Sequence, residues 1–151
     1  MPSHSPNPPG LARFSAAQDR GDIWRIALDE LRAGQKHSHW MWFVFPQIAG
    51  LGLSPTAQFY AIRGKGEAQA YLADPLLGTR LVTCTEAVLP WAGRRSLEAM
   101  FGPVDALKFR SSMTLFEAAG GNPCFARALD LFAGGERDWR TLALLAQAGS
   151  P

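Results

Sequence analysis

Between residues 11 and 148, three dipeptides pair a helix-capping Ser, Asp or Asn with a proline, and they constrain the fold more than any other feature. They are Ser54-Pro55, Asp74-Pro75 and Asn122-Pro123. A Ser, Asp or Asn side chain accepts a hydrogen bond from a free amide of the first helical turn. Proline is tolerated in that turn because the N–H that it lacks would have no partner inside the helix. Each dipeptide therefore predicts the start of a helix.

Apolar residues repeat at helical spacing along much of the chain. The clearest stripe consists of Leu77, Leu81, Cys84, Val88 and Trp91, which is typical of an amphipathic helix. Further helix starts are predicted at Asp22, Ser96 and Asp138, and Gly34 is expected to end the helix that Asp22 begins. No segment alternates polar and apolar residues beside a hairpin turn. The sequence therefore predicts an all-α fold, a single compact domain of about eight helices, several of them short.

The first ten residues differ from the rest of the chain in composition. Four of them are proline, so residues 1–10 are predicted to form a flexible, disordered tail. Residues 11–151 are then expected to form the single helical domain, which is long enough to bury a core.

The charge of the chain is nearly balanced, with fifteen Lys and Arg against thirteen Asp and Glu and a formal net charge of +2. Proteins that bind nucleic acid or a membrane surface through charge usually carry a larger basic excess. No apolar run approaches the roughly 20 residues that cross a bilayer. We therefore expect neither nucleic acid nor a membrane as a partner, a cytoplasmic location by default, and a monomer or a homodimer.

The segment Lys36–Gln47 has the most unusual composition, reading Lys-His-Ser-His-Trp-Met-Trp-Phe-Val-Phe-Pro-Gln. Ser38 is a candidate helix cap within it. Large aromatic side chains must pack closely, and the polar atoms of Trp, His and Gln need hydrogen-bond partners when they are buried. Such a segment is either an unusual core or the wall of a pocket, and its residues alone leave both interpretations open.

The predicted helix 104–119 is the second unusual element. Apolar residues cover most of its circumference, which is typical of a buried helix, yet Lys108, Ser111, Ser112 and Thr114 lie in its middle. Lys108 and Ser112 are one turn apart and share a face. The functional interpretation is an anion site built from Lys and Ser. In the alternative, which the residues alone favour, the serines bond to the backbone and Lys108 extends to solvent.

Histidine and cysteine raise the question of a metal. His37 and His39 are candidate ligands, but a site needs three or four donors, and the third histidine, His4, lies in the tail. Cys84 and Cys124 are 40 residues apart and are expected to be small buried apolar residues. We therefore expect no metal and no cofactor, while His39 remains a candidate for proton transfer near neutral pH.

A group of distinctive blocks runs from Leu11 to Leu145 and includes His39–Gln47, Gly50–Ser54 and Ser111–Phe116. In these blocks the chain resembles the bacterial family called domain of unknown function 1810, which some genomes mislabel calpastatin. The resemblance implies a helical fold of the family's own and no established activity. A looser likeness, carried by Lys108-Phe109 and Leu115, points to helical glycosidases that act on ADP-ribose or NAD-like nucleotides.

Two functional hypotheses follow. In the first, the protein binds or processes a small anionic, nucleotide-like ligand between segment Lys36–Gln47 and helix 104–119, with glycosidic hydrolysis as the candidate reaction. The candidate catalytic residues are His39, Lys108 and Ser112, and the candidate ligand-binding residues are Lys36, Trp40, Trp42, Gln47 and Ser111. Trp would stack on the ligand, Lys would bind phosphate, and Ser and Gln would form hydrogen bonds. This hypothesis predicts that the segment and the helix face each other across a cleft.

The second hypothesis is a non-catalytic interaction module. The aromatic segment would then be core, and a separate exposed apolar patch would bind a partner protein or a second copy of the chain. We prefer the first hypothesis because a domain that needs only stability can use Leu and Ala where this chain has His, Gln and Trp.

Overall fold

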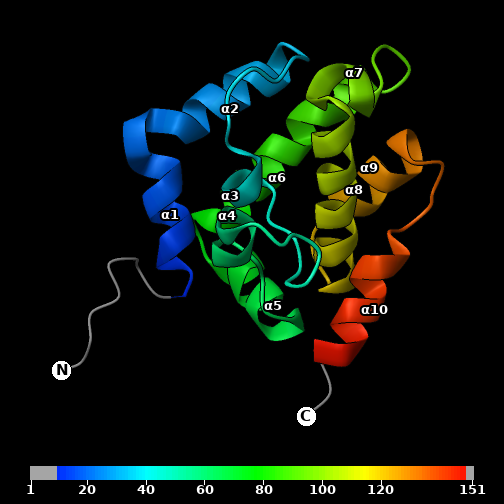
Figure 1. Cartoon of the computed structure of the whole chain (residues 1–151). Coiled ribbons are helices and arrows are strands. Elements are labelled where there is room, and N and C mark those ends of the chain that lie inside the picture. The colour runs from blue at the N-terminus through cyan, green and yellow to red at the C-terminus, as the bar shows by residue number, and fades with distance from the viewer. Residues whose placement is uncertain (1–9, 149–151) are drawn as a thin grey trace.

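Residues 10–148, the part of the chain that the computed structural model describes, form an all-α fold (Figure 1). The helices are α1 (Ala12–Asp19), α2 (Ile23–Arg32), α3 (Met41–Val44), α4 (Pro55–Phe59), α5 (Lys65–Ala73), α6 (Leu77–Val88), α7 (Leu97–Phe101), α8 (Pro103–Ala118), α9 (Cys124–Phe132) and α10 (Trp139–Ala148). The all-α prediction is confirmed, and the described range holds ten helices rather than about eight. The predicted tail, apart from Gly10, lies outside the described residues.

Helix α8 is the centre of the arrangement. It packs against α7, α9 and α10, and also against α5 and α3 (Figure 1). This many neighbours explains why residues 111–116 of α8 are all buried. Helix α6 forms the second layer and packs against α2, α5 and α9. Segments from the whole chain thus meet around two long helices.

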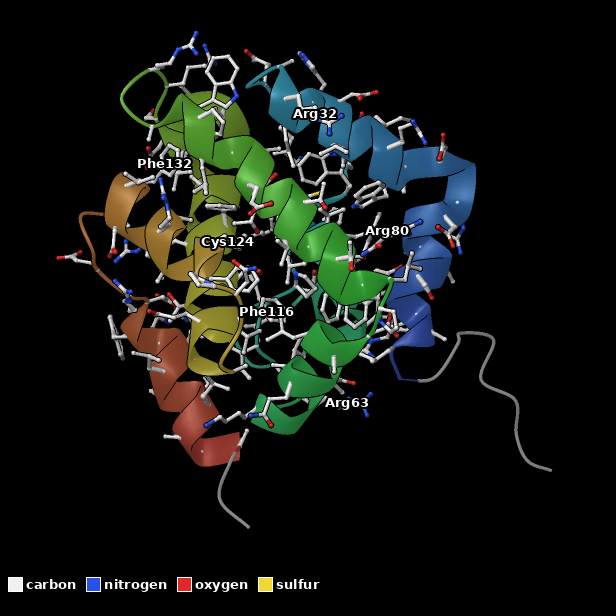
Figure 2. All side chains as sticks on the ribbon, turned by 180° about the vertical axis from the view of Figure 1, so that it is seen from behind. Arg32, Arg63, Arg80, Phe116, Cys124 and Phe132 are labelled. Carbon is white, nitrogen blue, oxygen red and sulfur yellow. The ribbon has the colours of Figure 1, made fainter. Side chains whose placement is uncertain are left out.

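Seen from behind, α6 crosses the molecule and Arg80 extends from it toward α1 (Figure 2). The Arg80 guanidinium pairs with Asp19 of α1 at 2.9 Å. It also lies over the ring of Trp24, with 5.0 Å between its central carbon and the ring centroid. These two contacts of Arg80 connect α1 and α2 to α6.

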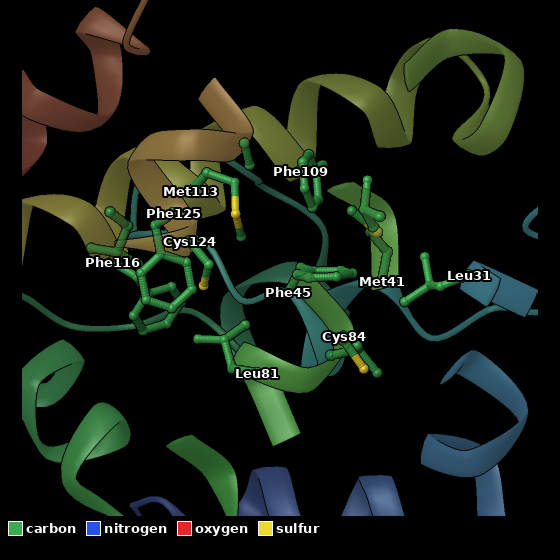
Figure 3. Close-up of a cluster of buried hydrophobic side chains, with 14 of the residues drawn as sticks. Leu31, Met41, Phe45, Leu81, Cys84, Phe109, Met113, Phe116, Cys124 and Phe125 are labelled. Atoms are coloured by element: carbon green, nitrogen blue, oxygen red, sulfur yellow. The ribbon is translucent and has the colours of Figure 1, made fainter. Parts of the chain in front are cut away.

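The core is one continuous cluster in which aromatic residues from distant segments meet (Figure 3). Phe45 contacts Phe109 edge to face, with ring centroids 5.0 Å apart. The ring of Phe109 also stacks on Phe101 at 5.2 Å. Cys84 and Cys124 are both buried and unpaired, as expected, and desolvation raises the pKa of each thiol to about 12. Neither thiol is therefore a reactive thiolate at neutral pH.

The loop that follows α3 is fixed by a single parallel β-bridge between Ile48 and Ile62. The Ile62 amide donates to the Gln47 carbonyl and the Ala49 amide to the Ile62 carbonyl, each at 2.8 Å. Both isoleucines are buried. The bridge therefore sets the position of Gln47 and of the loop 47–53, which reaches one side of α8.

Three of the predicted caps are confirmed. The Ser54 hydroxyl accepts from the Ala57 amide, and the Ser96 hydroxyl accepts from the Ala99 amide. Asp138 accepts from the Thr141 amide in the first turn of α10. Gly34 has a φ of 71° just after α2, as a left-handed helix end requires.

Three local predictions are wrong. Asp22 makes no side-chain cap, because it is itself left-handed with a φ of 58°. Ser38 starts no helix, because its hydroxyl is bound to Glu30 and α3 begins only at Met41. Helix α8 is not buried all round, because one face of its first turns carries the exposed side chains of Val104 and Leu107.

None of the helices in residues 10–148 is both long and apolar enough to cross a membrane.

Candidate functional site

The segment Lys36–Gln47 is held in place by one carboxylate, that of Glu30 on α2. Oε1 of Glu30 accepts from the backbone amides of His37 at 2.9 Å and Ser38 at 3.0 Å, and from the Trp40 indole at 2.9 Å. Oε2 accepts from the Ser38 hydroxyl at 2.6 Å. Desolvation alone would raise the pKa of Glu30, but the hydrogen bonds from Ser38, His37 and Trp40 outweigh it and lower the pKa to about 2.

These bonds help to place the middle of the segment in the core. Trp40, Met41, Val44 and Phe45 are all buried. The ring of Trp40 has no exposed surface and its N–H is bound to Glu30, so in this conformation it offers no face on which a ligand could stack. The aromatic composition of the segment is thus largely explained by packing.

One carboxylate, that of Asp105, stands between two ammonium groups from the segment and from α8. It is 2.9 Å from Nζ of Lys36 and 3.6 Å from Nζ of Lys108. The Lys36 side chain is only 8 % exposed. The two ammonium groups lie 5.0 and 5.1 Å from the ring centroids of Trp40 and Trp42, respectively. The cluster carries two positive charges against one negative charge, and a partly buried charge without an opposite charge is costly.

Lys108 also lines a surface pocket of about 380 Å³ between α8, the loop after α3 and the start of α10. The lining residues are Gln47, Leu51 and Gly52 of the loop, Val104, Leu107, Lys108, Arg110 and Ser111 of α8, and Asp138 and Arg140 at the start of α10. Figure 1 shows these three segments next to one another. The segment and the helix therefore do meet across a pocket, at the end of the segment that carries Gln47.

The pocket is cationic, with Lys108, Arg110 and Arg140 against the carboxylate of Asp138. Arg110 is 3.4 Å from Glu136 in an exposed pair, and exposed pairs neutralise each other weakly. Arg140 is exposed and forms no ion pair within residues 10–148. An anion in this pocket would therefore meet positive charge from two helices.

Asp138 has a structural task. Its Oδ2 accepts from the Thr141 amide at 3.1 Å and from the Thr141 hydroxyl. The Ser111 hydroxyl lies 3.2 Å from the same oxygen and 3.0 Å from the Leu107 carbonyl. The Asp138 amide donates to Thr114 at 3.0 Å. Asp138 thus caps α10 and fastens it to α8, which positions Arg140 at the pocket.

The remaining candidate residues are dispersed. Ser112 is completely buried, its hydroxyl has no hydrogen-bond partner in the described part of the chain, and it does not line the pocket. His37 and His39 are exposed and do not line the pocket. The structure therefore brings Lys108, Gln47 and Ser111 together, places Trp42 beside Lys108, and leaves His39 and Ser112 apart from them.

Arg110 and Arg140 are pocket residues that the sequence did not single out. They are 30 positions apart, and only the packing of α10 on α8 brings them together. A local signal for Arg140 exists, however. It is the second residue of α10, and a cation in the first turn of a helix is disfavoured by the helix dipole.

A larger hollow of about 660 Å³ lies between α6 and the turn after α8. Asp74 and Glu86 line it, and no Lys or Arg does. It is therefore a poor site for an anion. Within residues 10–148, no three His, Cys, Asp or Glu side chains are grouped as a metal site requires.

The sequence profile of the family described as "Protein of unknown function (DUF1810)" matches residues 8–145, so the chain belongs to this family. It is similar to the conserved hypothetical protein Rv1873 from Mycobacterium tuberculosis, whose crystal structure superposes with a TM-score of 0.85. The two chains are 52% identical over 90% of this chain and 96% of the other. No curated protein matches the chain significantly. Since neither description names an activity, the function has to be argued from the pocket.

Proposed function

We propose that the protein binds a small anionic, nucleotide-like ligand in the pocket formed by α8, the start of α10 and the loop after α3. The observation that carries this proposal is the excess of positive charge. Lys108 shares its carboxylate partner with Lys36, and Arg110 and Arg140 line the same pocket. A phosphate or carboxylate is the group that would compensate this charge.

Arg140 gives independent support. A cation in the first turn of α10 weakens the helix by about 0.3 to 1 kcal/mol when it is exposed. No ion pair within the described residues offsets this cost, and an anion bound in the pocket would offset it.

The pocket also offers neutral groups for orienting a ligand. The Gln47 amide and the Ser111 hydroxyl line it. The amide can donate and accept hydrogen bonds, whereas the Ser111 hydroxyl, which already donates toward Leu107 and Asp138, can accept them. Trp42 is half-buried beside Lys108, which keeps the ammonium group near the pocket. These groups suit the sugar hydroxyls and phosphate of a nucleotide.

Hydrolysis of a glycosidic bond is the reaction class we would test in the same pocket. The proposal is strongest for binding, because Asp138, the carboxylate that lines the pocket, is already engaged in capping α10. We further infer a cytoplasmic setting, in keeping with two buried cysteines that remain thiols.

The experiment is a thermal-shift screen of AMP, ADP-ribose, NAD and ribose 5-phosphate, followed by calorimetric titration of each hit. A ligand at 100 times its Kd adds about 2.7 kcal/mol of stability. Arg140→Gln should reduce the shift by about half or more, because tenfold weaker binding lowers the added stability to about 1.4 kcal/mol at the same ligand concentration. Arg127→Gln, which changes an exposed arginine of α9 outside the pocket, should keep it. The proposal is wrong if no anion shifts the Tm, or if both variants respond alike.

A second candidate function is the interaction module. It is favoured by the burial of the aromatic segment and by the exposure of Trp139 and Leu53. Light scattering over a range of concentrations tests it: a dimer that Trp139→Ser converts to a monomer would support this function, and a monomer at every concentration would exclude self-association.

A further inference from the structure

The face of α8 that lines the pocket is apolar in its first turn and polar in the next. Val104, Leu107, Lys108 and Ser111 line the pocket, and their spacing of three, four and seven residues places them on one face. The first two are apolar and the last two are polar. From Val104 to Ser111 the helix rises about 10 Å, so each half spans roughly one turn. Leu51 of the loop extends the apolar side.

The apolar side is unusually exposed for residues of this kind. Among residues 10–148 the four most exposed large apolar side chains are Leu53 at 79%, Trp139 at 73%, Val104 at 65% and Leu107 at 62%. Val104 and Leu107 line the pocket, Leu53 follows the lining residue Gly52, and Trp139 stands between Asp138 and Arg140. Exposed apolar groups gathered around one site indicate a surface that is covered by a ligand.

We infer that the ligand of this pocket is an amphipathic anion, namely a phosphate or carboxylate with an apolar or aromatic group about one helical turn, ~5 Å, from its charge. This inference rests on the proposed function and specifies its ligand class. The anionic group binds Lys108, Arg110 and Arg140, and the apolar group covers Leu107 and Val104. A nucleotide with its base, or an aryl phosphate, belongs to this class, whereas a bare sugar phosphate does not.

The test uses pairs of anions that share a charged group and differ in the apolar group. AMP is compared with ribose 5-phosphate, and phenyl phosphate with inorganic phosphate, by calorimetric titration of the full chain. Burial of an aromatic ring against Leu107 and Val104 should make the apolar member of each pair bind about tenfold more tightly. Adenosine, which has the base without the phosphate, serves as the neutral counterpart and should bind far more weakly than AMP.

Three variants separate the two halves of the pocket. Leu107→Gln should reduce the tenfold ratio to near one and leave weak binding of phosphate, because Leu107 is exposed and Gln keeps a high helix propensity. Arg140→Gln should weaken both members of each pair. Leu131→Gln changes an exposed leucine of α9 outside the pocket and should change nothing.

The outcomes distinguish the inference from the proposed function. Equal binding of AMP and ribose 5-phosphate, or a ratio that Leu107→Gln leaves intact, overturns the amphipathic ligand and leaves the anion pocket standing. Adenosine binding as tightly as AMP overturns the anion pocket. Absence of binding by every anion overturns both.

Discussion

The two ends of the segment Lys36–Gln47 differ in what holds them. Residues 36–45 are fixed by the four hydrogen bonds to Glu30, by the Lys36–Asp105 pair and by burial in the core. Gln47, two residues further on, lines an open pocket with Lys108 and Arg140. The segment with the most unusual composition therefore serves mainly structure, and apart from Gln47 the residues suited to binding come from α8 and α10.

The largest expected effect is a loss of stability when residues 36–45 lose their hydrogen bonds to Glu30. Glu30→Ala should lower the free energy of unfolding by about 3 kcal/mol, because it leaves four donors without their charged acceptor. Asp29→Ala is the matched control, since Asp29 is the exposed neighbour on the same helix; it should change stability by less than about 0.5 kcal/mol. Urea denaturation measures both. Equal effects of the two variants would show that Glu30 does not hold the segment.

The same carboxylate predicts a pH dependence. Its pKa is lowered from 4.5 to about 2 in the folded protein, so its contribution is complete above about pH 4.5 and is lost as the pH falls toward 2. The stability difference between wild type and Glu30→Gln should therefore shrink steadily between pH 5 and pH 2. Denaturation curves at pH 6, 4 and 2.5 measure it. A difference that is constant across this range would contradict the hydrogen-bond account.

Asp105 pairs with both Lys36 and Lys108, so a substitution there should affect both stability and anion binding. Asp105→Asn should cost about 2 kcal/mol, less than a fully buried pair because Asp105 and Lys108 keep some contact with solvent. The same change should tighten anion binding about threefold, because Lys108 loses its competing carboxylate. Glu98→Gln on α7, exposed and outside the pocket, is the control. Weaker anion binding in Asp105→Asn would show that Asp105 supports the site rather than competes with it.

A feature of the fold could be predicted from the sequence when its physical cause lies within a few residues along the chain. The caps at Ser54, Ser96 and Asp138 were predictable because each acts on an amide three residues away. The family was evident from the sequence blocks. The burial of Trp40 was not predictable, because its partner Glu30 lies ten residues earlier, on α2.

The sequence indicated only some of the residues that line the pocket. Lys108, Ser111 and Gln47 stood out because each is polar within an apolar segment. Arg110 and Arg140 look like ordinary surface residues, and the packing of α10 on α8 gives them their place. Helix 104–119 was expected to be buried all round because apolar residues cover most of its circumference. Only the structure shows that Val104 and Leu107 are exposed.

The smallest expected effect concerns Ser112. Its hydroxyl is buried without a hydrogen-bond partner in the described residues, so Ser112→Ala should be neutral or stabilise the fold by up to about 1 kcal/mol. It should leave the Kd of AMP unchanged, because Ser112 does not line the pocket. If Ser112→Ala lost binding or turnover while its stability stayed unchanged, Ser112 would be a functional residue after all.

We expect positive charge at the pocket to bind an anion, and titration of AMP into wild type, Arg140→Gln and Arg127→Gln is the decisive measurement. The account predicts a measurable Kd for wild type and Arg127→Gln and at least tenfold weaker binding by Arg140→Gln, the loss of one charge-assisted contact. It also predicts that Arg140→Gln is no less stable than wild type, because α10 loses a cation from its first turn. Equal affinity in all three proteins would contradict the claim.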